Sequence, residues 1–209
     1  MAQQEAREAL GTLNPIEAFD RWLSEATADQ KTDVPNALTL CTVQPGGKPS
    51  ARVVLLKGVK DGAFQFFTNY ESRKAREIET NSAGAMVFHW DWKAREVRVE
   101  GKIEKLSTEE SEEYFATRPR ESQIGAWASV QSAPLHGGKG ELLARYREYD
   151  ELFLGKPVPR PPHWGGYRLV PEHIEFWIGQ PGRLHDRFLF TRDNMKGPAA
   201  TWSVVRLSP

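Results

Sequence analysis

The sequence predicts a mainly β protein with peripheral helices, in which antiparallel strands form a closed or nearly closed barrel. Short hairpin turns join most of the β-leaning runs, and a helical insert separates five such runs from four more. Strands and helices do not alternate as they would in a doubly wound parallel sheet. Neither GxGxxG nor GxxxxGK[ST] occurs, so the two commonest nucleotide-binding loops are absent.

Composition narrows the class of protein. The 209 residues fit one sizeable domain or at most two small ones, and we expect a flexible segment at 1–14 followed by a single domain at 15–209. The 28 basic and 28 acidic residues cancel, which argues against a nucleic-acid binder. No membrane span, secretory signal or metal-binding spacing is evident, and Cys41 is the single cysteine. These features predict a soluble, cytoplasmic protein.

Capping signals mark the expected helices. Asn14 followed by Pro15 is typical of a helix start, and apolar residues then recur at helical spacing. Ser107 and Glu110 form a capping box. The expected helices span residues 15–29, 74–81, 108–118, 121–130 and 140–153.

Turn residues and side-chain alternation mark the expected strands. Lys60-Asp-Gly62 is a strong hairpin signal. Val97 and Val99 alternate with charged residues, so one face of their strand should be buried. The proline-rich stretch 155–162 is interpreted as a loop within the domain. The expected strands span 37–43, 51–58, 63–68, 83–92 and 95–106 before the helical insert, and 166–170, 173–178, 184–191 and 201–207 after it.

An unusual charge pattern marks the helix at 74–81. Ser72 is its expected N-cap, and Arg73, Lys74 and Arg76 stand where acidic residues are normally favoured. Cations at the positive end of a helix dipole are explained if an anion such as phosphate binds there. A solvated basic turn is the alternative, and this stretch alone does not decide between them.

Two further clusters could bind an elongated anionic ligand. Arg52 and Lys57 stand at the ends of an expected core strand, roughly 16 Å apart, and could hold opposite ends of one ligand. Tyr114, Arg118 and Ser122 follow one another at intervals of four residues and would suit a phosphate. Solvated strand-end charges and an ordinary surface pair are the respective alternatives.

The stretch Arg183-Leu-His-Asp-Arg187 carries a stronger signal. In a strand, Arg183, His185 and Arg187 would point the same way. Two arginines beside a histidine would repel one another in a core but would suit an anionic ligand, so a functional role is favoured.

Nine motifs occur in order along the chain: RVVLLK (52–57), FTNYESRKA (67–75), EVRVEG (96–101), YFATRPRESQIGAW (114–127), QS (131–132), HWGGYRL (163–169), IEFW (174–177), RLHDR (183–187) and RLSP (206–209). Taken together, they resemble the pyridoxamine 5′-phosphate oxidase family over roughly residues 15–209. The resemblance implies an FMN-dependent enzyme built on an FMN-binding split β-barrel, working as a homodimer with FMN between the subunits.

The resemblance implies a role for individual residues, in some cases across the subunit interface. It implies FMN contacts for Arg52, Val53, Lys57, Phe67, Thr68, Arg73, Lys74, Glu96, Gln131, Ser132, Trp177 and Arg187. It implies that the substrate phosphate meets Lys57, Tyr114, Arg118 and Ser122. Arg183 and His185 would lie over the substrate's pyridine ring, where they would position it and assist proton removal as the catalytic residues.

The reaction implied by the resemblance is oxidation of pyridoxamine or pyridoxine 5′-phosphate to pyridoxal 5′-phosphate. Hydride would pass to flavin N5, and dioxygen would then be reduced to hydrogen peroxide. A split-barrel flavin oxidase acting on another substrate, such as the phenazine-pathway relatives, is one alternative. A non-catalytic protein that binds FMN or pyridoxal phosphate is another.

Two positions depart from the family pattern. Glu96 stands where the family usually has a glutamine at the flavin edge, and a carboxylate there would disfavour a negatively charged reduced flavin. Alternatively, Glu96 pairs with Arg98 on the same strand face. The first residues offer Arg7 but no tyrosine, so the substrate-covering lid of many members is not predicted here.

Overall fold

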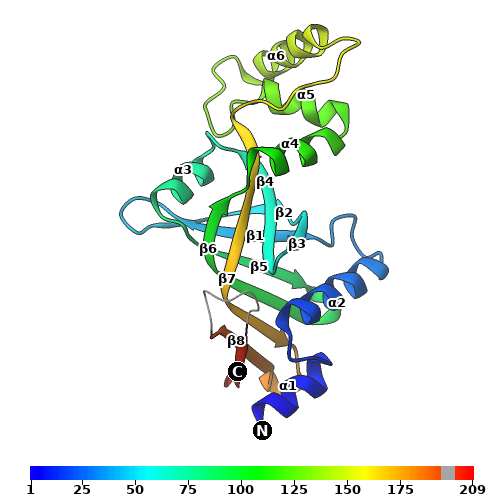
Figure 1. Ribbon diagram of the computed structural model, residues 1–209, viewed down its shortest axis with the longest axis vertical. Helices are drawn as coiled ribbons and strands as arrows, with labels where there is room; N and C mark the ends of the chain where they lie inside the picture. The colour runs from blue at the N-terminus through cyan, green and yellow to red at the C-terminus, as the bar shows by residue number, and fades with distance from the viewer. Residues whose placement is uncertain (194–200) are drawn as a thin grey trace.

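A curled antiparallel sheet forms the centre of the computed structural model, which describes residues 1–193 and 201–209 (Figure 1). Within these residues the sheet has nine strands, paired in the order β2-β1-β5-β6-β7-β4-β3, with β8 beside β7 and β9 beside β8. Every pairing is antiparallel. The strands are β1 Ala37–Val43, β2 Pro49–Leu55, β3 Gly58–Lys60, β4 Ala63–Asn69, β5 Ala83–Trp90, β6 Arg95–Lys105, β7 Trp164–Ile178, β8 Asp186–Arg192 and β9 Trp202–Arg206.

The long strand β7 organises the sheet. Its first residues pair with β4 and its last with β8, while β6 runs along its other edge. The register of β6 and β7 shifts at Gly101, which faces Pro171. A Cβ at Gly101 would collide with the carbonyl oxygen of Val170, so glycine permits this close approach. The bulge lies where β7 passes from its pairing with β4 to its pairing with β8, and the sheet curls into a half-barrel.

Six helices flank the described sheet. They are α1 Ala2–Leu10, α2 Pro15–Ala28, α3 Arg73–Thr80, α4 Thr108–Thr117, α5 Arg120–Ala128 and α6 Gly138–Leu152. Helices α4, α5 and α6 lie at one end of the molecule, and α1 lies with β8 at the other (Figure 1). None of these helices has the length and apolar character needed to cross a membrane.

Helix α2 packs against the sheet through buried aromatic side chains. The Asn14 side chain accepts from the N–H of Ile16 at 3.0 Å, so the predicted cap is confirmed. Phe19 packs edge-on against Phe64 at 4.9 Å between ring centroids, and Trp22 packs against Phe176 at 5.1 Å. These rings are at most 1% exposed, so the amphipathic pattern of α2 buries them in the barrel.

Several expectations need correction. The strands expected at 166–170 and 173–178 are one strand, β7. The expected core strand from Arg52 to Lys57 belongs largely to β2, which lies at a sheet edge and has no fully buried residue. The strand expected from 184 begins at Asp186. The segment 1–14, expected to be flexible, contains α1, whose Ala6 and Leu10 are fully buried.

Candidate functional site

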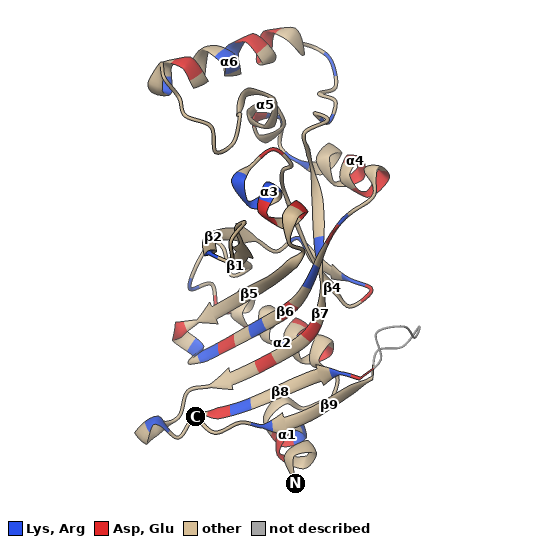
Figure 2. Ribbon diagram, turned by 90° about the vertical axis from the view of Figure 1, so that its left-hand side faces the viewer, with Lys and Arg blue, Asp and Glu red and all other residues tan. Residues whose placement is uncertain are grey.

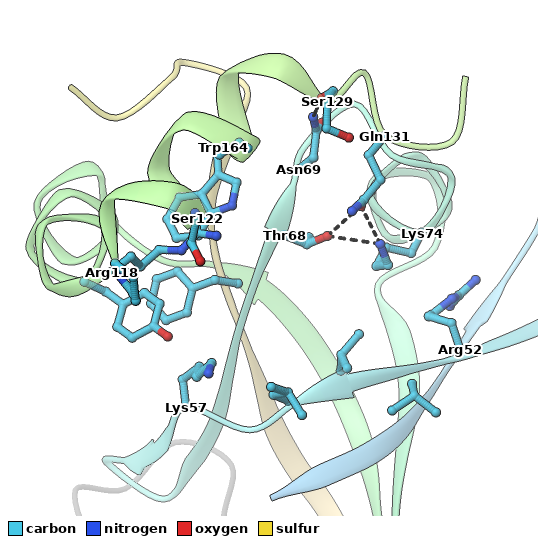
Figure 3. A pocket seen from close by; sticks show the side chains of 18 of the residues that line it. Arg52, Lys57, Thr68, Asn69, Lys74, Arg118, Ser122, Ser129, Gln131 and Trp164 are labelled. Atoms are coloured by element: carbon cyan, nitrogen blue, oxygen red, sulfur yellow. Dashed lines mark hydrogen bonds between the residues drawn. The ribbon is translucent and has the colours of Figure 1, made fainter. Parts of the chain in front are cut away.

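A cavity of about 710 Å³ opens between β2, β4 and the helices α3, α4 and α5 (Figure 3). This volume lies in the range of small-molecule sites. Polar and cationic side chains lie on both sides of β4, with Arg118 and Ser122 on one side and Lys74 and Gln131 on the other (Figure 3). Of the residues predicted from the sequence, the cavity is lined by Arg52, Val53, Lys57, Phe67, Thr68, Lys74, Tyr114, Arg118, Ser122 and Gln131.

Lys74 forms the first cationic corner of the cavity. Ser72 caps α3 as predicted, and the following turn directs the Lys74 ammonium to Thr68 Oγ1 at 3.0 Å and Gln131 Oε1 at 2.7 Å. Among the described residues no carboxylate lies within 4.0 Å of it. Burial, and secondarily the charge of Arg52, lower the pKa of Lys74 to about 8. An anion in this corner would relieve that cost.

Glu77 is a buried carboxylate that the sequence interpretation overlooked. Its side chain is 4% exposed and accepts hydrogen bonds from Thr42 at 2.5 Å, Ser50 at 2.6 Å, Arg52 Nη2 at 3.0 Å and Arg73 Nε at 2.9 Å. Burial alone would raise the pKa of Glu77, but these donors outweigh it and lower the pKa to about 2. Glu77 therefore stays ionised and holds two arginines beside Lys74.

The basic start of α3 is thus partly balanced within the protein. Arg73 turns to Glu77, one helical turn on, and does not line the cavity. Its backbone N–H donates to Ser132 Oγ at 3.2 Å, which joins the start of α3 to the loop after α5. Arg76 donates to the carbonyl of Glu71. Of Arg73, Lys74 and Arg76, Lys74 is the residue whose side chain lines the cavity.

Arg118 forms the second cationic corner. Helix α4 ends at Thr117, and the guanidinium carbon of Arg118 lies 4.6 Å from the ring centre of Trp164 and 5.5 Å from that of Phe115. Its Nη1 is buried and has no hydrogen-bond partner in the described part of the chain, and burial lowers the pKa of Arg118. Ser122 follows on α5. Both residues line the cavity, although α4 ends between them.

An aromatic stack separates Arg118 from Lys57. Tyr114 stacks on Phe67 with 4.0 Å between ring centroids, and Phe67 stacks on Trp164 at 5.4 Å. The Lys57 ammonium lies 5.9 Å from the Tyr114 ring centre. Arg52 lies on β2, and Lys57 lies two residues beyond the end of that strand. Both line the same cavity, as expected if they hold opposite ends of one ligand.

Most of the remaining predicted residues form a second group on β6, β7, β8 and the turn before β8, and acidic and basic residues alternate along these strands (Figure 2). Glu96, Trp177 and Arg187 are direct neighbours across the three strands. Glu96 accepts from Arg98 at 2.6 Å, which confirms the pairing considered as an alternative. Arg187 donates to Glu175 at 2.7 Å, and this bond raises the pKa of Arg187.

The turn before β8 holds the two predicted catalytic residues. The prediction that Arg183, His185 and Arg187 point the same way in a strand is wrong, because a short 3-10 turn ends at Arg183 and the strand starts after His185. Arg183 has φ of 63°, a strained conformation for a side chain of this size. The His185 ring packs against Trp177 in a tilted arrangement with 4.6 Å between ring centroids, and its Nδ1 accepts the backbone N–H of Gln180 at 3.1 Å.

The two groups lie at opposite ends of β7 and do not meet within one chain. Trp164 lines the cavity, whereas Trp177 stands thirteen residues further along the same strand. An extended strand of that length spans up to roughly 43 Å. Glu96, Trp177, Arg183, His185 and Arg187 are therefore not part of the cavity of their own chain.

Comparison with known proteins agrees with this architecture. A family model described as pyridoxamine 5′-phosphate oxidase matches residues 24–151, and one described as the pyridoxine 5′-phosphate oxidase C-terminal dimerisation region matches residues 164–209. A pyridoxine/pyridoxamine 5′-phosphate oxidase of Burkholderia orbicola is 52% identical and covers 97% of this chain and 92% of its own. The protein of that name from Paraburkholderia xenovorans is 50% identical and covers 100% and 99%.

Solved structures support the same fold. The crystal structure of PhzG from Burkholderia lata, in complex with tetrahydrophenazine-1-carboxylic acid, has a TM-score of 0.85 and 30% identity, over 93% of this chain and 92% of that one. A pyridoxamine 5′-phosphate oxidase-related, FMN-binding protein from Nostoc punctiforme has a TM-score of 0.75 at 17% identity, over 95% and 100% of the two chains. The curled sheet defines a split-barrel protein. The chain belongs to the pyridoxamine 5′-phosphate oxidase family.

Proposed function

We propose that this protein is an FMN-dependent oxidase that converts pyridoxamine and pyridoxine 5′-phosphate to pyridoxal 5′-phosphate. The observation that carries this proposal is a single cavity with two cationic corners, one at Lys74 and one at Arg118. A phosphorylated cofactor beside a phosphorylated substrate would need two such corners. The names of relatives at 50–52% identity support the same reaction.

The Lys74 corner fits the phosphate of FMN. Lys74 is a half-buried lysine without a carboxylate partner among the described residues, and Thr68 and Gln131 offer polar groups beside its ammonium. Arg52 and Arg73 add positive charge that Glu77 partly balances. Phe67 and Val53 line the cavity with apolar surface, and Val53 is 69% exposed, as expected of a residue that a planar ring system could cover.

The Arg118 corner fits the substrate's phosphate. Its Nη1 lacks a hydrogen-bond partner among residues 1–193 and 201–209, and Tyr114, Ser122 and Lys57 line the same cavity. A guanidinium, an ammonium and hydroxyl groups are typical ligands of a phosphate dianion. The stacked rings of Tyr114 and Phe67 form an apolar wall of the cavity.

In the proposed reaction the bound flavin would supply the redox chemistry, accepting hydride from the 4′ carbon of the substrate and passing electrons to dioxygen to give hydrogen peroxide. The protein's own residues bind and orient. His185 Nδ1 accepts the Gln180 N–H, so its neutral ring carries a proton on Nε2 and can donate to the substrate. The positive charge of Arg183, beside His185, would stabilise negative charge that develops on the substrate's pyridine ring.

This assignment of Arg183 and His185 requires a second copy of the chain. Both lie at the far end of β7 from the cavity of their own chain, with Glu96, Trp177 and Arg187. We propose a homodimer in which this group completes the partner's site. The match of residues 164–209 to a dimerisation region supports it, because that segment contains the strand and turn concerned.

An oxidase acting on a phenazine precursor is the second candidate, since the PhzG structure is similar along most of the chain. A non-catalytic flavin-binding protein is the third. Incubation of the purified protein with pyridoxine 5′-phosphate, with and without added FMN, separates them. The proposed oxidase releases hydrogen peroxide and forms pyridoxal 5′-phosphate in equal amounts. Absence of both products with FMN bound would refute the proposal.

A further inference from the structure

Two arginines that line the cavity, Arg52 and Arg118, are held in different ways. Arg52 is held through its guanidinium edge by a carboxylate, Glu77, at 3.0 Å. Arg118 has no carboxylate within 4.0 Å among the described residues, and aromatic faces hold it instead. A carboxylate that binds the edge of a guanidinium occupies its N–H donors and neutralises its positive charge. A face-on ring stabilises the cation and leaves its edge N–H groups and its charge available to a ligand.

Trp164 is a rigid platform for this purpose. Its residue exposure is 6%, and its ring contacts Phe115 edge-on at 5.0 Å and Phe67 in a stack at 5.4 Å. It is the first residue of β7 and pairs with Asn69 of β4. The carbonyl of Trp164 accepts from Arg160 Nη1 at 2.5 Å. Backbone pairing and ring packing therefore fix the indole.

Arg118 needs such a platform because its own backbone does not fix it. It is the residue after α4, in extended conformation between Thr117 and Pro119, and its backbone N–H bonds only to Phe115 of the preceding turn. Without the indole, the long side chain would keep the more distant Phe115 ring as its aromatic support. Its Nη1 is buried and has no hydrogen-bond partner among the residues that the structure describes.

We propose that Trp164 is a positioning residue for the phosphate of the substrate: its indole holds the Arg118 guanidinium by the flat face and keeps its charge uncompensated. This inference rests on the proposed function, because it takes the substrate phosphate to be the anion at Arg118. Trp164 is not among the residues proposed above to bind the phosphate of FMN or the phosphate of the substrate.

A double-mutant cycle tests the inference on the FMN-loaded protein. The variants are Trp164→Leu, Arg118→Met and the two combined, with the dissociation constant of pyridoxal 5′-phosphate measured by calorimetry and KM and kcat measured with pyridoxine 5′-phosphate. A cation–π contact in a desolvated site predicts about a 5- to 30-fold rise in both the dissociation constant and KM for Trp164→Leu, with kcat within about threefold. In the Arg118→Met background the same change should have no further effect.

Two further variants make the cycle interpretable. Trp164→Phe keeps an aromatic face and should raise the dissociation constant by no more than about threefold, an effect that also vanishes with Arg118→Met. Trp127→Leu removes an indole from the same aromatic cluster, where no arginine is stacked on it, and should leave the dissociation constant unchanged. If Trp164→Leu does not fold, the cycle is run with Trp164→Phe alone.

The outcomes separate this inference from the proposed function. Additive effects of the Trp164 and Arg118 substitutions would overturn the positioning role, whether or not the protein turns over substrate. Coupled binding of pyridoxal 5′-phosphate without peroxide release would sustain the positioning role and refute the oxidase. A large fall in kcat with unchanged binding would also overturn the inference.

Discussion

Replacement of Glu77 by glutamine should destabilise the fold by about 3 kcal/mol. The Glu77 carboxylate is 4% exposed and accepts from two hydroxyl groups and two arginines. Its pKa of about 2, against an ordinary value of 4.5, corresponds to about 3 kcal/mol at 1.36 kcal/mol per unit. Glutamine has the same shape but cannot accept from all four donors. Urea unfolding of the cofactor-free protein at pH 7 and fixed concentration measures the difference.

The stability difference should depend on pH with a definite sign. The folded-state pKa of Glu77 lies below its ordinary value, so its stabilisation is complete above about pH 5 and is lost as the pH falls toward about 2. The gap between the wild type and Glu77→Gln should therefore be constant from pH 7 to pH 5. At pH 3 it should be less than half as large.

Glu79→Gln is the matched control on the same helix. Glu79 is 64% exposed and pairs with Lys105 at the surface, so its loss should change stability by less than about 0.5 kcal/mol. A Glu77→Gln variant that is as stable as this control, or a gap that widens as the pH falls, would refute the account of the buried carboxylate.

Three further predictions concern the proposed FMN site. Arg73→Glu combined with Lys74→Glu should leave a folded protein that purifies without yellow colour; a yellow variant would contradict the assignment of the phosphate corner. Because the pKa of Lys74 is about 8, its charge is lost above that pH, and the dissociation constant of FMN should rise there. Lys74→Arg should flatten this rise, and an unchanged pH profile would exclude Lys74 from phosphate binding. Glu96→Gln should tighten FMN binding or speed flavin reduction, measured by titration and anaerobic stopped flow. A variant that changes neither would show that Glu96, paired with Arg98, does not act on the flavin.

Local patterns predicted most of the elements because their causes are local. The Ser107 capping box and the Asn14 cap are contacts between near neighbours, and both are present. The alternation around Val97 and Val99 identified β6 because it packs one face in the core. The continuity of β7 was missed because Pro171 is typical of a strand break, whereas here it lies at the bulge opposite Gly101.

Part of the candidate site could be predicted because some of its residues are close together in the sequence. The spacing of Tyr114, Arg118 and Ser122 allowed either a shared ligand or an ordinary surface pair, and the structure places all three at one cavity. Glu77 could have been found from its i,i+4 relation to Arg73. Its burial could not, because that depends on Thr42 and Ser50 packing over it from β1 and β2.

The turn at Arg183 shows the limit of alternation arguments. A strand pattern was assumed through His185, but the left-handed conformation of Arg183 and the 3-10 turn place the two residues differently. Trp164 gave no local signal either, because its partner Arg118 is distant in the sequence. The placement of Arg183 and His185 and the contact between Trp164 and Arg118 both depend on the folded structure.

The most direct test of the proposed function measures hydrogen peroxide and pyridoxal 5′-phosphate together, from purified protein supplied with FMN, dioxygen and pyridoxine 5′-phosphate. The account predicts equal amounts of the two products. It also predicts a strong loss of turnover for Arg118→Met at low substrate concentration, while FMN remains bound. An FMN-loaded protein that forms neither product would contradict it.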